Sequence, residues 1–452
     1  MSTEPLPVAV VTPEPGNLKW LYIGRGLRSF STAFLTVAFP LYLARLHEPA
    51  ATIGLVLTGV GIITAGLVAG VGVVGDRLGR RPVMIGVGLL GALGAFGLVM
   101  SSNLAVVVVA SALGGIGRGG GAGSGGAFGP FFPVEQPLLA GSVAPSERTK
   151  VFGRIGFVGV LAAAAGSPVA GLTTLLHHGG ASWEDAYKTV FLIGAVVSLA
   201  VAATSVPLRE HRQARRSAEG TGPGQVSPPA NVGPAGLSTR QLISRFAFTN
   251  ALNGLGFGFL GPLLTYWFYV RFGAGPAEVG LLYTVVNLVS AVPFLGAHRL
   301  TSRLGAVLTV VVTRSASVVV LLAMAFMPGF VLAGMMLSLR TIFNSLGLPA
   351  RQSYTMGATD ERHRGTVASL SALPSMVTSS ISPSIGGAVM GAFVDVPLIG
   401  AAVFMGANTL TYYLAFRHAP LPGERQGAYQ RSRASGSPAD DQSASVTAAG
   451  KT

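Results

Sequence analysis

The chain contains about twelve runs of mostly apolar residues, and each is long enough for a helix to cross a membrane, although the fourth is too long for one straight helix. Such a helix takes about 20 residues. Because no backbone polar group can stay unbonded in lipid, runs of this kind form helices. The sequence therefore predicts an all-α membrane protein with twelve transmembrane helices. The runs lie near 20–44, 52–74, 83–101, 104–140, 151–175, 188–207, 242–269, 276–297, 305–326, 330–352, 366–392 and 395–416.

The composition agrees with a membrane protein and excludes several other classes. Only 11% of the residues are charged, whereas soluble domains have about 25%. The chain has no cysteine, which excludes a disulfide scaffold, thiol catalysis and cysteine-ligated metal. No constellation of acid, base and nucleophile indicates an enzyme, and we expect neither a cofactor nor a metal site. The chain also lacks an ATP-binding P-loop, so a proton or other ion gradient is the expected energy source.

The net charge of +14 is distributed as in a membrane protein rather than as in a nucleic-acid-binding protein. With the N-terminus in the cytoplasm, the inner loops carry 15 Lys and Arg residues and the outer loops carry three. Cytoplasmic loops are enriched in these residues, so both termini are predicted to be cytoplasmic. A chain rich in Gly, Ala and Arg with four lysines is typical of a high-GC bacterium. We therefore expect a multi-pass protein of the bacterial inner membrane.

Two polar segments divide the chain. Residues 208–240 carry a basic stretch followed by Gly, Pro and Ser, which is the composition of a flexible linker. We predict that this linker joins an N-terminal six-helix half, 20–207, to a C-terminal six-helix half, 241–417. Residues 1–19 are predicted to be a short cytoplasmic segment. Residues 418–452 are polar and poor in aromatic residues, so we predict a disordered cytoplasmic tail.

The two halves repeat one another. Four residues of the first half recur 216 residues later, and a Ser-Pro pair followed by Gly recurs 215 residues later. Generic hydrophobicity does not fix Pro, Gln and Arg at a constant spacing, so we infer two pseudo-symmetric halves that bind substrate between them. The matching positions are Pro133, Gln136, Gly141 and Arg148 with Pro349, Gln352, Gly357 and Arg364, and Ser167, Pro168 and Gly171 with Ser382, Pro383 and Gly386.

Residues 72–81 read G-V-V-G-D-R-L-G-R-R, between the second and third runs. This resembles the loop signature of the major facilitator superfamily, G-x-x-x-D-R-x-G-R-R. The resemblance implies secondary active transport by alternating access. It also implies a charged cluster in this loop that latches the cytoplasmic side while the transporter faces outward, with glycines that permit close helix approach. The latch residues that it implies are Gly72, Asp76, Arg77, Gly79 and Arg81.

A Gly-Ser-Pro-x-x-Gly sequence in the fifth run resembles the antiporter signature G-P-x-x-G of the family's exporters, except that Ser167 interrupts the Gly-Pro pair. It implies a bacterial exporter of drugs or other small molecules. A proline kink with small residues for packing is the alternative. The residues of this helix-bend motif and its second copy are Gly166, Pro168, Gly171, Pro383 and Gly386.

Ionisable residues inside apolar runs are energetically expensive and usually functional. Arg28, Arg118 and Arg340 are of this kind. Arg118 aligns with Arg340 through a six-residue gap in the repeat, so we expect these two to face each other across a central cavity. Asn344 lies one helical turn from Arg340 and shares its face. Arg25, nearer the start of its run, is expected to extend to the cytoplasmic interface.

Glu135 is the one acid that we place within an apolar run, and the repeat aligns it with Arg351. The two could form a salt bridge between the fourth and tenth helices that opens during transport. Alternatively, Glu135 is the protonatable coupling site, or a structural pair near the inner surface. Arg314 could be a structural ion-pair or hydrogen-bonding residue. Further polar candidates for the cavity wall are Asn250, Asn253, Tyr283 and Asn287.

Two hypotheses about function follow. The first is a proton-coupled exporter of a small organic molecule, based on the family resemblance and the helix-bend motif. The second is a transporter, by uptake or exchange, of an organic anion bound by intramembrane arginines. A non-transporting receptor is a third class, and the intact loop around Asp76 argues against it. The expected partners are a small-molecule substrate and membrane lipid, without nucleic acid, and we expect a monomer.

Overall fold

A computed structural model describes residues 15–116, 129–142, 148–209, 239–261, 263–358 and 364–417. These ranges are helical and contain no β-strand, as the predicted all-α fold requires. The helices are α1 (Pro15–Arg45), α2 (Ala50–Leu78), α3 (Arg80–Met100), α4 (Leu104–Gly114), α5 (Phe132–Gly141), α6 (Arg148–Gly166), the 3₁₀ helix η2 (Ser167–Gly171), α7 (Leu172–His178), α8 (Trp183–Ser205), α10 (Thr239–Leu260), α11 (Leu264–Phe272), α12 (Pro276–Leu304), α13 (Ala306–Ala325), α14 (Phe330–Ala358), α15 (Arg364–Met390) and α16 (Val396–Phe416).

Nine helical segments in the described part of the chain are long and apolar enough to cross a membrane. The other three predicted spans differ in physical character. The fourth and seventh are each divided into two shorter helices, α4 with α5 and α10 with α11, and the eleventh, α15, is long but rich in serine. α4 ends because Gly115 adopts a left-handed φ of 63°, a conformation that glycine takes without strain.

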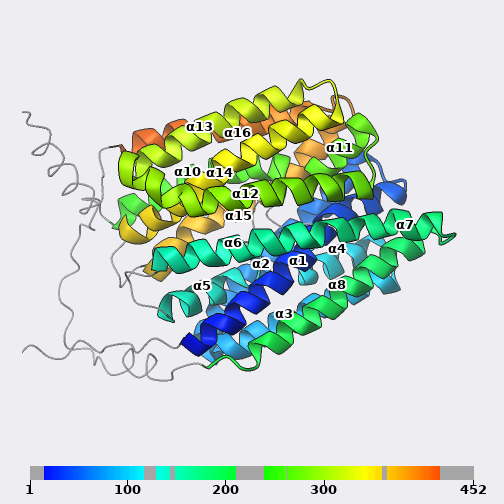
Figure 1. The fold of residues 1–452 in the computed structure, drawn as a ribbon, viewed down its shortest axis with the longest axis horizontal. Helices are drawn as coiled ribbons and strands as arrows, with labels where there is room; N and C mark the ends of the chain where they lie inside the picture. Colours follow the sequence, from blue (N-terminus) through cyan, green and yellow to red (C-terminus); the bar gives the residue numbers. More distant parts are fainter. Residues whose placement is uncertain are drawn as a thin grey trace, which may run out of the picture.

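The helices form two groups that lie side by side. Figure 1 shows α1, α3 and α8 on one side of the molecule and α13, α14 and α16 on the other. The groups meet where α2 packs on α15 and where α6 and η2 pack on α12. Glycines make the first contact close, because a Cβ at Gly54 would collide with the carbonyl oxygen of Pro383, and one at Gly387 with that of Ala50. Small residues allow helix backbones to approach in this way.

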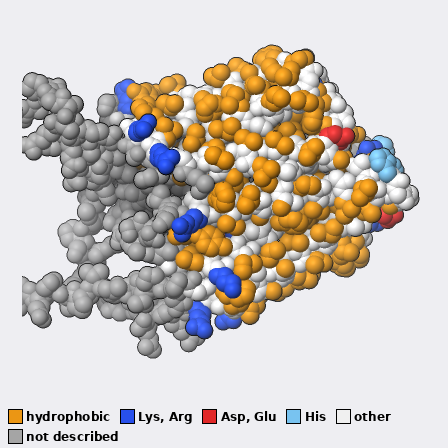
Figure 2. Space-filling view, in the orientation of Figure 1, with side chains coloured by type: hydrophobic (Ala, Val, Ile, Leu, Met, Phe, Trp, Pro, Cys, Tyr) orange, Lys and Arg blue, Asp and Glu red, His pale blue; other side chains and the backbone are white. Residues whose placement is uncertain are grey.

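Charged side chains gather at the two ends of the molecule, and the surface between them is largely apolar (Figure 2). We call the end with the exposed Arg77 and Arg81, where α2 meets α3, the basic end. The opposite end, with the exposed Glu184 and Glu278 at the starts of α8 and α12, is the acidic end. An apolar band between two charged ends is the surface that a lipid bilayer covers.

The two groups of helices approach most closely near the acidic end. In α2, a Cβ at Gly61 would lie 2.9 Å from Cβ of Ser380 in α15, and Gly54 is packed still more tightly. At Gly66 and Gly70, further along α2 toward the basic end, no described atom lies within 4 Å of the position that a Cβ would take. The contact between α2 and α15 is therefore tight at one end and looser at the other.

Candidate functional site

A buried charge cluster joins α1 to α5. Oε2 of Glu135 accepts hydrogen bonds from Nη1 of Arg25 at 2.9 Å and from Nη2 of Arg28 at 2.5 Å. The side chains of Glu135 and Arg25 are 1% and 3% exposed. The guanidinium of Arg28 also lies 4.7 Å from the ring centroid of Phe131, within the range of a cation–π interaction. Charge interactions therefore hold the two helices together inside the protein.

Sequence spacing accounts for the local geometry of this cluster. Arg25 and Arg28 are three residues apart on α1, so their side chains share a face. Glu135 lies in the first turn of α5, where the helix dipole favours a negative charge. Pro133 occupies the start of the same turn, where its missing N–H costs no hydrogen bond. The carboxylate is thus stabilised by its own helix as well as by α1.

Two expectations about these charges can be compared with the structure. In this state, Arg25 and Arg28 bind the carboxylate of Glu135, and Arg351 donates to Oδ1 of Asn250, so a salt bridge between Glu135 and Arg351 that opens during transport stays a prediction for another state. Arg25 does not extend to the interface but lies buried beside Glu135. In both cases the apolar pattern of the sequence identifies a charged residue within a span, but it does not show which helix packs against that residue.

The second half of the molecule holds partly buried arginines of another kind. Arg314 of α13 donates to Oδ1 of Asn253 at 2.6 Å and to Oδ1 of Asn408 at 2.7 Å, which is the structural hydrogen bonding left open above. Nη2 of Arg340 lies 3.7 Å from Sδ of Met405, and its Nε is buried without a hydrogen-bond partner. Among the described residues, no carboxylate pairs with Arg314 or Arg340.

The other cavity candidates divide between described and undescribed parts. Asn344 is partly buried on α14, one turn beyond Arg340. Arg118 lies outside the described residues, so the predicted pairing of Arg118 with Arg340 stays a prediction. Asn287 of α12 donates to Oγ of Ser167 at 3.4 Å, so it bridges two helices across the contact between the halves.

The predicted latch lies where α2 turns into α3 at the basic end. Gly79 joins the two helices with a φ of 102°, a conformation that side chains rarely adopt, so glycine is required there. Arg77 and Arg81 are exposed beside this turn. Asp76 belongs to the last turn of α2, and its side chain is outside the described part of the structure.

Close packing beside the latch falls on Gly75 rather than on Gly72. A Cβ at Gly72 would lie 3.7 Å from Cβ of Pro133, which is an ordinary contact. A Cβ at Gly75 would lie 2.7 Å from Cγ1 of Val134, so this position tolerates a side chain less well. The family motif contains Gly72, whereas the packing of α5 makes Gly75 the position that has less room for a side chain.

The helix-bend motif of the fifth span lies at two helix contacts. After α6, residues Ser167–Gly171 form the 3₁₀ helix η2, with Pro168 near its start. A Cβ at Gly166 would collide with the carbonyl oxygen of Phe30 in α1, and one at Gly171 would lie 3.3 Å from Cα of Ala277 in α12. The glycines of the motif therefore admit the neighbouring backbones.

The second copy of the motif has a different local structure but a similar place. Pro383 lies inside the continuous helix α15, and its carbonyl oxygen is the one that Gly54 approaches. A Cβ at Gly386 would lie 2.7 Å from Cδ1 of Leu263. Both copies thus have a packing role at contacts between helices.

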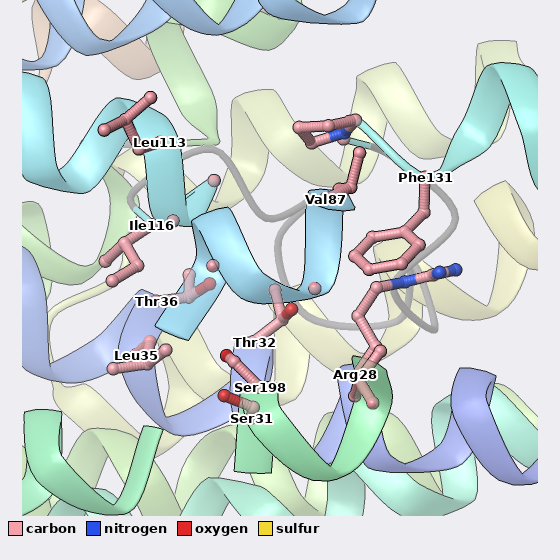
Figure 3. Close-up of a pocket in the computed structure, with 17 residues that line it drawn as sticks. Arg28, Ser31, Thr32, Leu35, Thr36, Val87, Leu113, Ile116, Phe131 and Ser198 are labelled. Carbon is pink, nitrogen blue, oxygen red and sulfur yellow. The ribbon is translucent and has the colours of Figure 1, made fainter. Parts of the chain in front are cut away.

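A cavity that the sequence analysis did not anticipate lies within the first half (Figure 3). It has a volume of about 60 Å³ and is bordered, among the described residues, by α1, α3, α8 and the facing ends of α4 and α5. Polar groups reach it from Arg28, Ser31, Thr32 and Thr36 of α1. We call it the N-half cavity. The sequence feature that could have indicated this cavity is the group of three hydroxyl residues, Ser31, Thr32 and Thr36, within six positions of the first apolar run.

Comparison with known proteins gives a consistent family assignment. The family model of the Major Facilitator Superfamily matches residues 21–383, and no curated protein matches the chain. The human organic anion transporter MFSD10 (TETRAN) is 18% identical, with a TM-score of 0.56 over 90% of this chain and 100% of that chain. The nucleoside transporter NupG is 14% identical, with a TM-score of 0.60 over 88% and 100%. The xylose transporter XylE of E. coli, in an inward open conformation, is 12% identical, with a TM-score of 0.65 over 88% and 95%. Similarities at these identities establish the fold.

Proposed function

The chain belongs to the major facilitator superfamily and is a membrane transporter rather than an enzyme, and from this premise we propose that its substrate is a small organic anion. The observation that carries the proposal is the pair Arg314 and Arg340, two cations inside the second half that no described carboxylate neutralises. Both side chains are partly buried, and a charge withdrawn from water without a counter-charge is costly. An anionic substrate that entered between the halves would supply the missing charge during each cycle.

Arg340 is the better candidate for direct substrate contact. Arg314 already donates to two amide oxygens, whereas the recorded polar contact of Arg340 is the thioether of Met405, which is a weak acceptor. A guanidinium can bind a carboxylate through two parallel hydrogen bonds. Asn344, one turn along α14, lies on the same face and is suited to orient such a ligand.

The test is a thermal-shift screen of the purified protein in detergent, with organic anions, lipophilic cations, a nucleoside and a sugar side by side. A ligand that binds only the folded protein raises its Tm. Organic anions should stabilise the parent protein, and Arg340→Met should remove that effect. The control is Arg271→Met, because Arg271 is an exposed residue at the acidic end with its own partner, Asp395, at 3.5 Å. Stabilisation by cations alone would refute an anionic substrate.

Alternating access would use the contact between α2 and α15. We propose that the basic end faces the cytoplasm of a bacterial inner membrane, as the positive-inside rule favours. The tight packing at the acidic end then closes the outer side, and the looser basic end is the open one. In the opposite state, the loop with Asp76, Arg77 and Arg81 would latch the inner side, as the family resemblance implies.

Proton-coupled efflux is the second candidate, and the buried carboxylate of Glu135 is the observation that favours it. Arg25 and Arg28 both bind this carboxylate, so a proton could be taken up only after those ion pairs separate. In proteoliposomes with an imposed pH gradient, Glu135→Gln should abolish proton-driven transport while substrate exchange continues. Coupling that survives this substitution would exclude Glu135 as the proton carrier.

A further inference from the structure

We propose that the N-half cavity is a binding site for a small monovalent anion of the size of a halide or nitrate, separate from the arginines that would bind the substrate. The cavity lies inside the first half, whereas Arg314 and Arg340 belong to α13 and α14 of the second. The proposal therefore does not depend on the identity of the transported substrate.

Unpaired hydroxyl groups are the first observation behind this proposal. Ser31 and Thr36 are 5% and 7% exposed, and both line the cavity. Within the described chain, neither hydroxyl has a protein hydrogen-bond partner. Elsewhere in the bundle such groups usually donate to the carbonyl four residues earlier, as Thr284 does to Gly280 at 2.9 Å. Buried polar groups are nearly always satisfied, so these hydroxyls have donors available for something inside the cavity.

The electrostatic character of the walls is the second observation. Figure 3 shows the hydroxyls of Ser31 and Thr32 between Arg28, which extends under Phe131, and the apolar Leu35. The described lining contains no Asp or Glu. Beside this wall, Arg25 and Arg28 share the single carboxylate of Glu135, which lies in the first turn of α5, so the cluster keeps one positive charge in excess. Hydroxyl donors next to a cluster of net positive charge favour a negative ligand over a cation.

The size of the cavity limits the ligand. A volume of about 60 Å³ is room for roughly four water molecules, at about 15 Å³ each on the same measure. That space accommodates one small anion with one or two waters, but not a drug-sized molecule. An ion in contact with the apolar part of the wall, which includes Leu35 and Ile116, loses part of its hydration shell. The free-energy cost of that loss is smallest for a large, weakly hydrated monovalent ion.

The test compares the Tm of the purified full-length protein in sodium chloride, bromide or nitrate with that in sodium gluconate at equal ionic strength. Gluconate is too large for the cavity and controls for screening. We expect the three small anions to raise the Tm saturably by roughly 3 °C. The double variant Ser31→Ala with Thr36→Val should lose this rise, and each single variant should weaken the apparent affinity several-fold. The control Ser338→Ala should keep it, because that hydroxyl donates to its own helix at Gly334.

The outcomes separate this proposal from the proposed function. Equal Tm values in all salts would show that the cavity holds only water and would overturn the proposal. A halide effect that persists in the double variant but disappears in Arg340→Met would place the ion at the substrate arginine, and would also overturn it. The double variant should have the parent's Tm in gluconate, which verifies that it folds. A bromide anomalous peak beside Ser31 and Thr36 in a crystal would support the site directly.

Discussion

The stability of the first half depends on Glu135 more than on any exposed charge. Glu135→Gln would leave the guanidinium groups of Arg25 and Arg28 facing a neutral amide in a buried place. Removal of one member of a buried ion pair costs about 3–5 kcal/mol, so we expect the Tm to fall by roughly 5 °C or more. The control is Glu184→Gln, because Glu184 is 51% exposed in a surface pair with Lys188, where the cost is at most about 1 kcal/mol.

Adding Arg28→Gln to Glu135→Gln should recover part of the lost stability, because one uncompensated cation is removed. A double-mutant cycle by thermal shift measures that coupling. Additive losses in the two variants would contradict an ion pair between Arg28 and Glu135.

At the scale of single residues, the sequence identifies Glu135 as exceptional, since a lone acid in an apolar run is rare. It does not identify its partners, because the repeat aligns Glu135 with Arg351 although α1 lies nearer.

At the scale of elements, glycines decide how closely α2 and α15 can approach. A Cβ at Gly54 would collide with the carbonyl oxygen of Pro383, so Gly54→Ala should force the helices apart at the acidic end. Because the chain has no cysteine, Ser380→Cys can report this opening through its rate of reaction with a membrane-impermeant maleimide. We expect labelling at least several-fold faster with Gly54→Ala than without it.

Gly66→Ala is the matched control in the same helix, because no described atom lies near that position. Alanine is a better helix former than glycine, so this variant should be as stable as the parent and label at the parent rate. If Gly66→Ala also increased the labelling rate, the effect would come from any alanine substitution in α2 and not from the contact at Gly54. A sequence motif locates the turn at Gly79 from backbone chemistry alone. Close approach at Gly54 depends on a partner helix more than 300 residues away, which no local pattern reveals.

At the scale of the whole molecule, hydropathy, loop charge and the repeat predict a helical bundle with charged ends. The structure supports these features because each follows from how a chain meets lipid and water. The N-half cavity was not predictable, since its described wall comes from α1, α3, α8 and the ends of α4 and α5, which lie far apart in the sequence. The same limitation applies to Arg340: the sequence shows a cation within an apolar run, but only the packing of the helices shows that it lies beside Met405.

Alternating access requires the two halves to separate at the acidic end once per cycle, and a covalent bond across that contact should therefore stop transport. The N–H of Ser384 in α15 donates to Oγ1 of Thr58 in α2 at 3.0 Å, so the two backbones are within the range that a disulfide can bridge. Thr58→Cys with Ser384→Cys should lose nearly all transport in proteoliposomes on oxidation and regain it on reduction, while each single variant stays active. Substrate binding measured by thermal shift should persist in the oxidised protein, because the other end remains free to open. Undiminished transport by the fully cross-linked protein would show that the contact between α2 and α15 does not open during the cycle.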